Sequence, residues 1–364
     1  MIRTPTTTTT AAVITTVLLF LVILLITIQQ LLQSQKMSTS PNPTPINPYK
    51  RLHIIPNSYG TLTRLPEFFP TVPPSTTNST ALSLSKDVVI NTEKNTWVRI
   101  FLPRNVSDLE TSSSKKLPIL LFIHGGGFIL CSAASPVFHE FCTNMASRLS
   151  ALVISVEYRL APEHRLPAPY DDVLEALTWV KERKDEWITK HGDLSRCVLM
   201  GESAGGNIVY HAGLKAANQI NDFKPLIIKA MILIQPYFGG VDRTESEIRL
   251  GNDVALPLVV NDLMWDLALP VGSNRTHEYC DPFVGDGLKL WDRVRDLGWE
   301  IGVAGCDGDP LFDRNVELVK VLERRGLSVR AMFDKGGSHG MFVSDISKTI
   351  ELFEFVNKFF IFKD

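Results

Sequence analysis

The chain has 364 residues, of which 45% are hydrophobic and 21% are charged, and its formal net charge is -2. This composition is that of a globular protein with a sizeable core, and it excludes a disordered or fibrous chain. Because the net charge is close to zero and no Lys/Arg run occurs, nucleic acid is not predicted as a partner.

The N-terminus divides into a polar tail (residues 1–10), an apolar segment (residues 11–32) and a linker (residues 33–48), ahead of one folded domain over residues 49–364. The apolar segment is long enough for a membrane-spanning helix, which needs about 20 residues, and no A-x-A cleavage site follows it. It predicts a signal-anchor of the endoplasmic-reticulum type, although the flanking charges are too few to fix its orientation. The alternative is a translation start at Met37, which would remove the anchor and give a cytoplasmic protein.

From residue 87 onward, apolar runs typical of buried strands alternate with stretches in which apolar residues recur near the 3.6-residue helical period. Buried strands separated by helices imply a mainly parallel sheet covered by helices on both faces. Ligands bind to such sheets at the carboxyl ends of the strands. The predicted strands lie at 87–102 (two strands around a polar turn), 117–123, 151–156, 197–200, 227–234, 299–304 and 327–333, and the predicted helices include 170–191 and 346–360.

The pentapeptide GESAG at residues 201–205 follows the apolar run 197–200 and precedes a helical pattern. A G-x-S-x-G sequence between a strand and a helix is the pattern of a nucleophile elbow. Its two glycines allow strand and helix to approach closely, so that the hydroxyl of Ser203 is held out at the carboxyl edge of the sheet. Ser203 is therefore the candidate nucleophile.

Three glycines, Gly125, Gly126 and Gly127, follow the predicted strand 117–123. A loop without side chains lets backbone N–H groups converge on an anion. An oxyanion hole needs such donors, because negative charge develops on the carbonyl oxygen as a nucleophile adds. The N–H groups of this loop, with that of Ala204 directly after the serine, are the predicted oxyanion hole.

A serine hydroxyl needs a base to take its proton. Of the eight histidines, His339 lies in a post-strand loop late in the chain. Proteins with a nucleophile elbow have their catalytic residues in the chain order serine, acid, histidine, so the base is expected there. The acid must lie between them, and the segment 306–313 offers three aspartates. Asp309 is the predicted acid, with Asp307 as the alternative. A buried aspartate there would accept the imidazole Nδ1–H and stabilise the imidazolium.

The five cysteines form an odd, scattered set without a C-x-x-C pair, so that neither a disulfide framework nor a zinc site is predicted. Buried free thiols are expected instead, as in a reducing compartment. The cysteines are Cys131, Cys142, Cys197, Cys280 and Cys306.

Five motifs together resemble the plant carboxylesterases of the hormone-sensitive-lipase-like group of α/β hydrolases. The resemblance covers residues 46 to 364, in order and with similar spacing. The motifs are HGGGF at 124–128, YRLAPEH at 158–164, GESAGG at 201–206, DPL at 309–311 and the GSH sequence that ends at His339.

The resemblance implies an α/β-hydrolase fold in which an N-terminal segment (about 51–69) and a helical insertion (about 244–269) cover the active site. It implies Ser203 as nucleophile, Asp309 as acid and His339 as base. It also implies hydrolysis of small carboxylic esters, often of specialised metabolites, without a metal or a cofactor.

A small-molecule ester is accordingly the expected partner, and the oligomeric state is not predicted. The substrate pocket is assembled from distant segments, and four apolar residues are predicted to line it. They are Phe128, Leu130, Phe238 and Phe342.

The same family includes proteins that do not hydrolyse esters, so the fold does not settle the activity. Gibberellin receptors resemble this fold but lack the catalytic histidine, which is present here as His339. Dehydratases and cyclases of the family use the site for elimination or rearrangement, and the dehydratases often have threonine as the nucleophile. Because Ser203 is retained, ester hydrolysis is predicted, with a triad-bearing dehydratase or cyclase as the alternative.

Overall fold

A computed structural model describes residues 46–76, 81–104, 116–285 and 287–361. The predicted apolar segment 11–32 lies outside these residues. The unit Pro48–Asp364 carries the architecture given below. In the part of the chain that is described, no helix is long and apolar enough to cross a bilayer.

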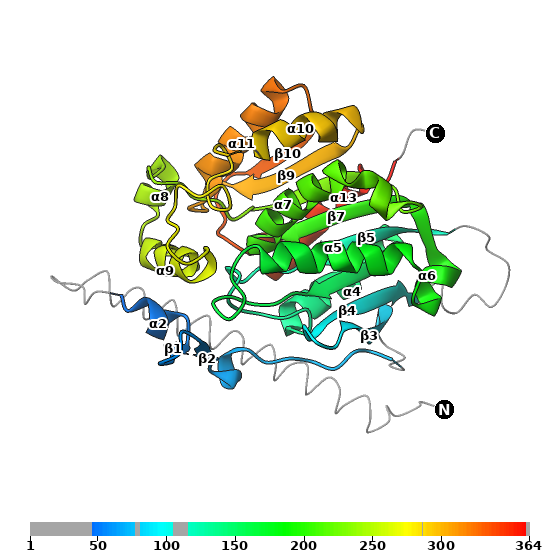
Figure 1. Cartoon of the computed structure of the whole chain (residues 1–364), viewed down its shortest axis with the longest axis horizontal. Coiled ribbons are helices and arrows are strands. Elements are labelled where there is room, and N and C mark those ends of the chain that lie inside the picture. The colour runs from blue at the N-terminus through cyan, green and yellow to red at the C-terminus, as the bar shows by residue number, and fades with distance from the viewer. Residues whose placement is uncertain (1–45, 77–80, 105–115, 286, 362–364) are drawn as a thin grey trace, which may run out of the picture. The chain divides into compact units, whose positions relative to one another are not determined.

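One sheet of the Pro48–Asp364 unit contains eight of the strands in the described residues (Figure 1). They are β3 (Ser83–Asn91), β4 (Thr96–Pro103), β5 (Leu117–Ile123), β6 (Leu152–Glu157), β7 (Gly192–Glu202), β8 (Ile228–Ile234), β9 (Glu300–Cys306) and β10 (Ser328–Asp334). Their order across the sheet is β10-β9-β8-β7-β5-β6-β4-β3. The six strands from β10 to β6 in this order pair in parallel, whereas β4 pairs antiparallel with both β6 and β3. The predicted mainly parallel sheet is confirmed.

Helices cover both faces of this sheet because its central strands, such as β5 and β7, carry apolar side chains on both sides. Leu121 and Leu199 belong to one buried cluster, while their chain neighbours Phe122 and Met200 belong to a second cluster. Successive side chains of a strand point to opposite faces, which explains this division. The first cluster includes residues of α5 (Ala168–Lys181), α7 (Ala204–Asn218), α10 (Gly287–Asp296) and α11 (Phe312–Arg324), and the second includes residues of α4 (Pro136–Leu149), α12 (Met341–Ser344) and α13 (Ile346–Asn357).

The prediction of one helix over residues 170–191 is wrong, because two helices, α5 and α6 (Glu186–His191), occupy this stretch. Arg183 between them has a positive φ of 53°, which a continuous α-helix excludes. Asp185 then starts α6 as its N-cap, accepting a hydrogen bond from the N–H of Trp187. The apolar period continues across the break because α6 also buries an apolar residue, Ile188.

The N-terminal segment that is predicted to cover the site forms a short hairpin, β1 (Ile54–Pro56) and β2 (Leu62–Arg64). The guanidinium of Arg64 at its end donates to the carbonyl of Ile129, at 2.6 Å. Ile129 lies just beyond the glycine loop that follows β5, so the hairpin is attached to that loop.

The predicted helical insertion contains α8 (Glu245–Arg249) and α9 (Leu258–Ala268). Met264 of α9 packs against the glycine loop, since a β-carbon added to Gly127 would lie 2.3 Å from the Met264 sulfur. Helix α9 therefore contacts the loop that carries the predicted oxyanion hole, and the hairpin contacts the residue just beyond that loop.

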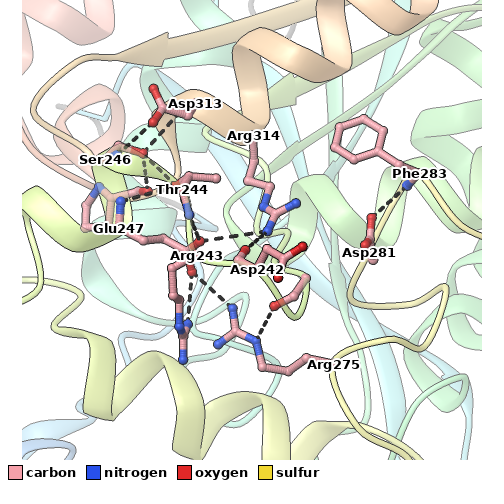
Figure 2. Close-up of polar contacts among 12 residues, drawn as sticks. Asp242, Arg243, Thr244, Ser246, Glu247, Arg275, Asp281, Phe283, Asp313 and Arg314 are labelled. Carbon is pink, nitrogen blue, oxygen red and sulfur yellow. Dashed lines mark hydrogen bonds and ion pairs between the residues drawn. The ribbon is translucent and has the colours of Figure 1, made fainter.

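Helix α8 is held by the carboxylate of Glu247, which is fully buried (Figure 2). Glu247 accepts from Arg243 and Arg275, each at 3.0 Å, and from the backbone N–H of Thr244, also at 3.0 Å. Thr244 in turn caps the helix by accepting the backbone N–H of Glu247, which completes a capping box. A buried carboxylate is stable only when it is paired and hydrogen-bonded in this way.

Candidate active site

Ser203 occupies the sharp turn between β7 and α7. Its φ of 55° and ψ of -119° form a conformation that residues other than glycine rarely adopt, at a cost on the order of 1–3 kcal/mol. The backbone around it enforces this conformation: the Ser203 N–H donates to the carbonyl of Ile234 (2.8 Å), and the Ser203 carbonyl accepts from the N–H of Tyr237 (2.9 Å). The hydroxyl is thereby placed at the carboxyl end of β7.

The turn is possible because glycine lies on each side of it. A β-carbon at Gly201 would be 2.1 Å from the carbonyl oxygen of Gly205, and a β-carbon at Gly205 would be 2.0 Å from the carbonyl oxygen of Ile123. Both obstacles are backbone atoms, so no side-chain rotation could relieve either clash.

We expect Gly201→Ala to destabilise the protein by about 1–3 kcal/mol, because the backbone must shift to admit one methyl group. Thermal unfolding followed by circular dichroism should show a Tm lower by several degrees. Gly287→Ala is the control: a β-carbon at this helical position would find its nearest neighbour 3.9 Å away, and its Tm should be unchanged or higher. Equal Tm values for the two variants would contradict the tight fit at Gly201.

Three side chains from three loops form one hydrogen-bonded chain. Ser203 Oγ lies 2.8 Å from His339 Nε2, and His339 Nδ1 lies 2.9 Å from Asp309 Oδ2. Asp309 follows β9 and His339 follows β10, and since the carboxyl ends of parallel strands meet at one edge, both residues reach Ser203. The Asp309 side chain is fully buried, and the His339 side chain is 12% exposed.

The other two aspartates of the segment 306–313 have different partners. Asp307 accepts the backbone N–H of Gly336 at 2.5 Å, and Asp313 accepts the backbone N–H of Ser246 at 2.7 Å (Figure 2). Of the three, Asp309 is the aspartate that contacts the histidine.

Three carboxyl groups, those of Asp309, Glu202 and Asp253, act on the imidazole of His339. Burial disfavours the imidazolium, but the charge of Asp309 and its hydrogen bond outweigh burial and, together with Glu202, raise the pKa of His339 to about 9. Glu202 is itself buried under the glycine loop, where a β-carbon on Gly125 would lie 2.0 Å from a Glu202 carboxyl oxygen. Burial raises the pKa of Glu202 to about 7. The carboxyl groups thus make His339 a stronger base than an ordinary histidine.

The glycine loop after β5 lies beside the serine, because β5 and β7 are neighbouring strands. Gly126 and Gly127 have φ values of 111° and 61°, in the region that favours glycine. Ala204 is the first residue of α7, where a backbone N–H has no partner within the helix. Backbone donors of the loop and of the helix are therefore available on two sides of Ser203.

The four residues predicted to line the substrate pocket are all buried. Phe128, Phe238 and Phe342 are 0% exposed and Leu130 is 8% exposed. Phe128, Leu130 and Phe238 belong to one apolar cluster, whereas Phe342 belongs to the cluster on the opposite face of the sheet. The structure thus does not bring the four into one group, and their contact with substrate stays a prediction.

Sequence reasoning missed Gln235, the residue directly after β8. Its amide nitrogen donates to Asp309 Oδ2 at 2.7 Å and to the carbonyl of Ser338 at 3.1 Å, and its amide oxygen accepts the N–H of Gly340 at 2.9 Å. No motif marks a glutamine in this role. The available signal was its place at the carboxyl end of a buried strand, the edge at which active sites lie.

All five cysteines are free thiols, as predicted, and four of them are buried. Among the residues that the structure describes, no group of three or more His, Cys, Asp or Glu side chains is arranged to hold a metal ion.

Comparison with known proteins identifies the family. A family described as alpha/beta hydrolase fold matches residues 120–343. Carboxylesterase 20 of Arabidopsis thaliana is 45% identical over 322 residues, which cover 87% of this chain and 98% of that protein. A 3-O-acetylpapaveroxine carboxylesterase of Papaver somniferum is 44% identical over 264 residues, covering 71% of this chain and 83% of that protein.

A solved structure agrees in fold. The thermostable carboxylesterase EstE1, cloned from a metagenomic library, matches with a TM-score of 0.63 and 23% identity, over 79% of this chain and 89% of that structure. The chain belongs to the plant carboxylesterases of the hormone-sensitive-lipase-like α/β-hydrolase family and is a carboxylic ester hydrolase.

Proposed function

We propose that this esterase hydrolyses small carboxylic esters of plant specialised metabolites through a Ser203–His339–Asp309 triad and an acyl-enzyme. The observation that carries the proposal is the continuous hydrogen-bonded chain of the three side chains, with contacts of 2.8 and 2.9 Å. The substrate class is supported by the Papaver somniferum relative, whose name denotes an O-acetylated compound.

In the proposed reaction, Ser203 Oγ attacks the ester carbonyl while His339 Nε2 takes its proton. The N–H groups of Gly126, Gly127 and Ala204 hold the oxyanion of the tetrahedral intermediate. His339 then gives the proton to the leaving alcohol, and water repeats the cycle on the acyl-enzyme. Asp309 holds the imidazole in the required tautomer and stabilises the imidazolium.

Release of p-nitrophenol from p-nitrophenyl acetate and butyrate tests the reaction. The full-length protein should show a burst close to one equivalent of enzyme if deacylation is slower than acylation, followed by steady turnover. A panel of acetylated and butyrylated plant alcohols would then define the preferred ester. Folded protein with negligible release would redirect the proposal to the dehydratase or cyclase chemistry of related proteins.

Glu202→Gln should shift the acidic limb of the kcat/KM profile to lower pH. The limb reports the imidazolium of the free enzyme, and activity is lost as pH falls through its pKa. Because the Glu202 charge helps to raise the pKa of His339, its removal lowers that pKa. The measurement is kcat/KM for p-nitrophenyl butyrate from acid to alkaline pH. A limb that stays in place would show that Glu202 does not act on the histidine.

A further inference from the structure

Gln235 connects the ends of three neighbouring strands. It directly follows β8, its backbone N–H donates to the carbonyl of Ala304 in β9 at 2.7 Å, and its side chain is fully buried. Its φ of 41° is positive, which is uncommon for a residue with a side chain and indicates that the surroundings fix its conformation.

The side chain of Gln235 contacts the backbone on both sides of His339, the proposed base. Gln235 donates to the carbonyl of Ser338, the residue before the histidine, and accepts the N–H of Gly340, the residue after it. The same amide nitrogen donates to Asp309 Oδ2, the oxygen that also contacts His339 Nδ1. One side chain therefore fixes both the loop of the base and the carboxylate of the acid.

The chemistry of the site requires an amide here. Two N–H donors face the oxygens of Asp309 and Ser338, while an acceptor faces the N–H of Gly340. A carboxylate has no donor and an ammonium has no acceptor, so neither could make all three contacts. The opposite orientation of the amide would place oxygen against two oxygens and N–H against N–H. The hydrogen-bonding pattern thus defines both the residue type and its orientation.

We propose that Gln235 is a positioning residue for ester hydrolysis, which holds Asp309 and the His339 loop in register with Ser203. The inference rests on the proposed triad. Gln235 does not touch the serine or the reacting carbonyl; it acts through the acid and the base. Small displacements of a catalytic group are costly, about 100-fold in rate for about 1 Å.

Gln235→Met keeps the length of the side chain and removes its hydrogen bonds to Asp309, Ser338 and Gly340, as well as a longer one to the Cys306 sulfur. Its kcat for p-nitrophenyl butyrate should fall by about 10- to 100-fold, with KM changed by less than about threefold, because the defect lies in the geometry of the reacting groups. Tyr210→Phe is the matched control. It removes a buried hydroxyl that bonds to Pro282 and Trp291, so it should lower Tm while leaving kcat within about twofold.

Gln235→Glu supplies a readout that a purely structural role would not give. The new carboxyl can still accept from Gly340, but it can donate to Asp309 only while it is protonated. Its kcat should therefore fall as pH rises through the titration of that carboxyl, which adds an alkaline limb that the wild type lacks. This variant also serves if Gln235→Met does not fold.

Wild-type kcat in Gln235→Met, or a wild-type pH profile in Gln235→Glu, would overturn the positioning role. Ser203→Ala, assayed in parallel, separates this outcome from failure of the triad itself. An inactive Ser203→Ala beside a fully active Gln235→Met would refute the inference about Gln235 alone. An active Ser203→Ala would refute the proposed triad and the inference with it.

Discussion

Ser203→Ala is expected to lower kcat for p-nitrophenyl butyrate by about 10⁴-fold or more, because the variant has no nucleophile to form an acyl-enzyme. The pre-steady-state burst should disappear as well. Binding of a non-hydrolysable ester analogue should be largely retained, since the alanine removes one hydroxyl and adds no atom to the site. Stopped-flow release of p-nitrophenol and isothermal titration with the analogue measure the two properties.

Ser195→Ala is the matched control for this experiment. Ser195 lies on β7, the strand that ends beside Ser203, but its side chain is exposed and bonds only locally, to Asp193. It should keep kcat within about twofold of the wild type. Retention of substantial turnover in Ser203→Ala would remove this serine from the mechanism.

Asp309→Asn should lower kcat by about 10⁴-fold, because an amide nitrogen can donate to Nδ1 and so stabilise the wrong tautomer of the imidazole. The substitution also removes the charge that raises the pKa of His339. Any residual activity should therefore show its acidic limb at lower pH than the wild type, since less alkaline solution suffices to deprotonate the imidazole. The measurement is the pH dependence of kcat/KM.

Asp307→Asn is the comparison that tests the choice of acid. Asp307 accepts the N–H of Gly336 in the loop that carries His339, and the amide oxygen of asparagine can still accept that N–H. An effect of less than about threefold is therefore expected. A larger effect of Asp307→Asn than of Asp309→Asn would assign the acid to Asp307.

The elements that position the site could be predicted because the local motif and the order of strands along the chain point to the same residues. The elbow sequence at 201–205 lies between an apolar strand and a helix, and its glycines are required by backbone contacts that any such turn would have. Asp309 and His339 follow β9 and β10, in the serine–acid–histidine chain order that the elbow predicts. Ser203, Asp309 and His339 could each be predicted because each lies within a few residues of the end of a predicted strand.

Features that depend on the packing of distant segments could not be predicted. Gln235 has no motif, because its role arises only when β8, β9 and β10 lie side by side. The sequence pattern does not reveal the break in the helix at Arg183, because the apolar residues of α6 follow those of α5 at helical spacing. Residue type alone predicts that Phe342, Phe128 and Phe238 line one pocket. The side of the sheet on which each phenylalanine lies depends instead on the path of the chain.

The covering helix α8 and the loop of Asp309 are physically joined. The hydroxyl of Ser246 in α8 donates to the carbonyl of Pro310 at 2.8 Å, one residue beyond the aspartate. A chimaera that received only this helix from another esterase would have new contacts to the proposed acid together with a new segment at the place where a cover is predicted. It would also leave Arg243 and Arg275 without the carboxylate of Glu247. We therefore expect that substrate preference and turnover are not independently exchangeable, and that a working transplant carries the helix, its arginines and the aspartate loop together.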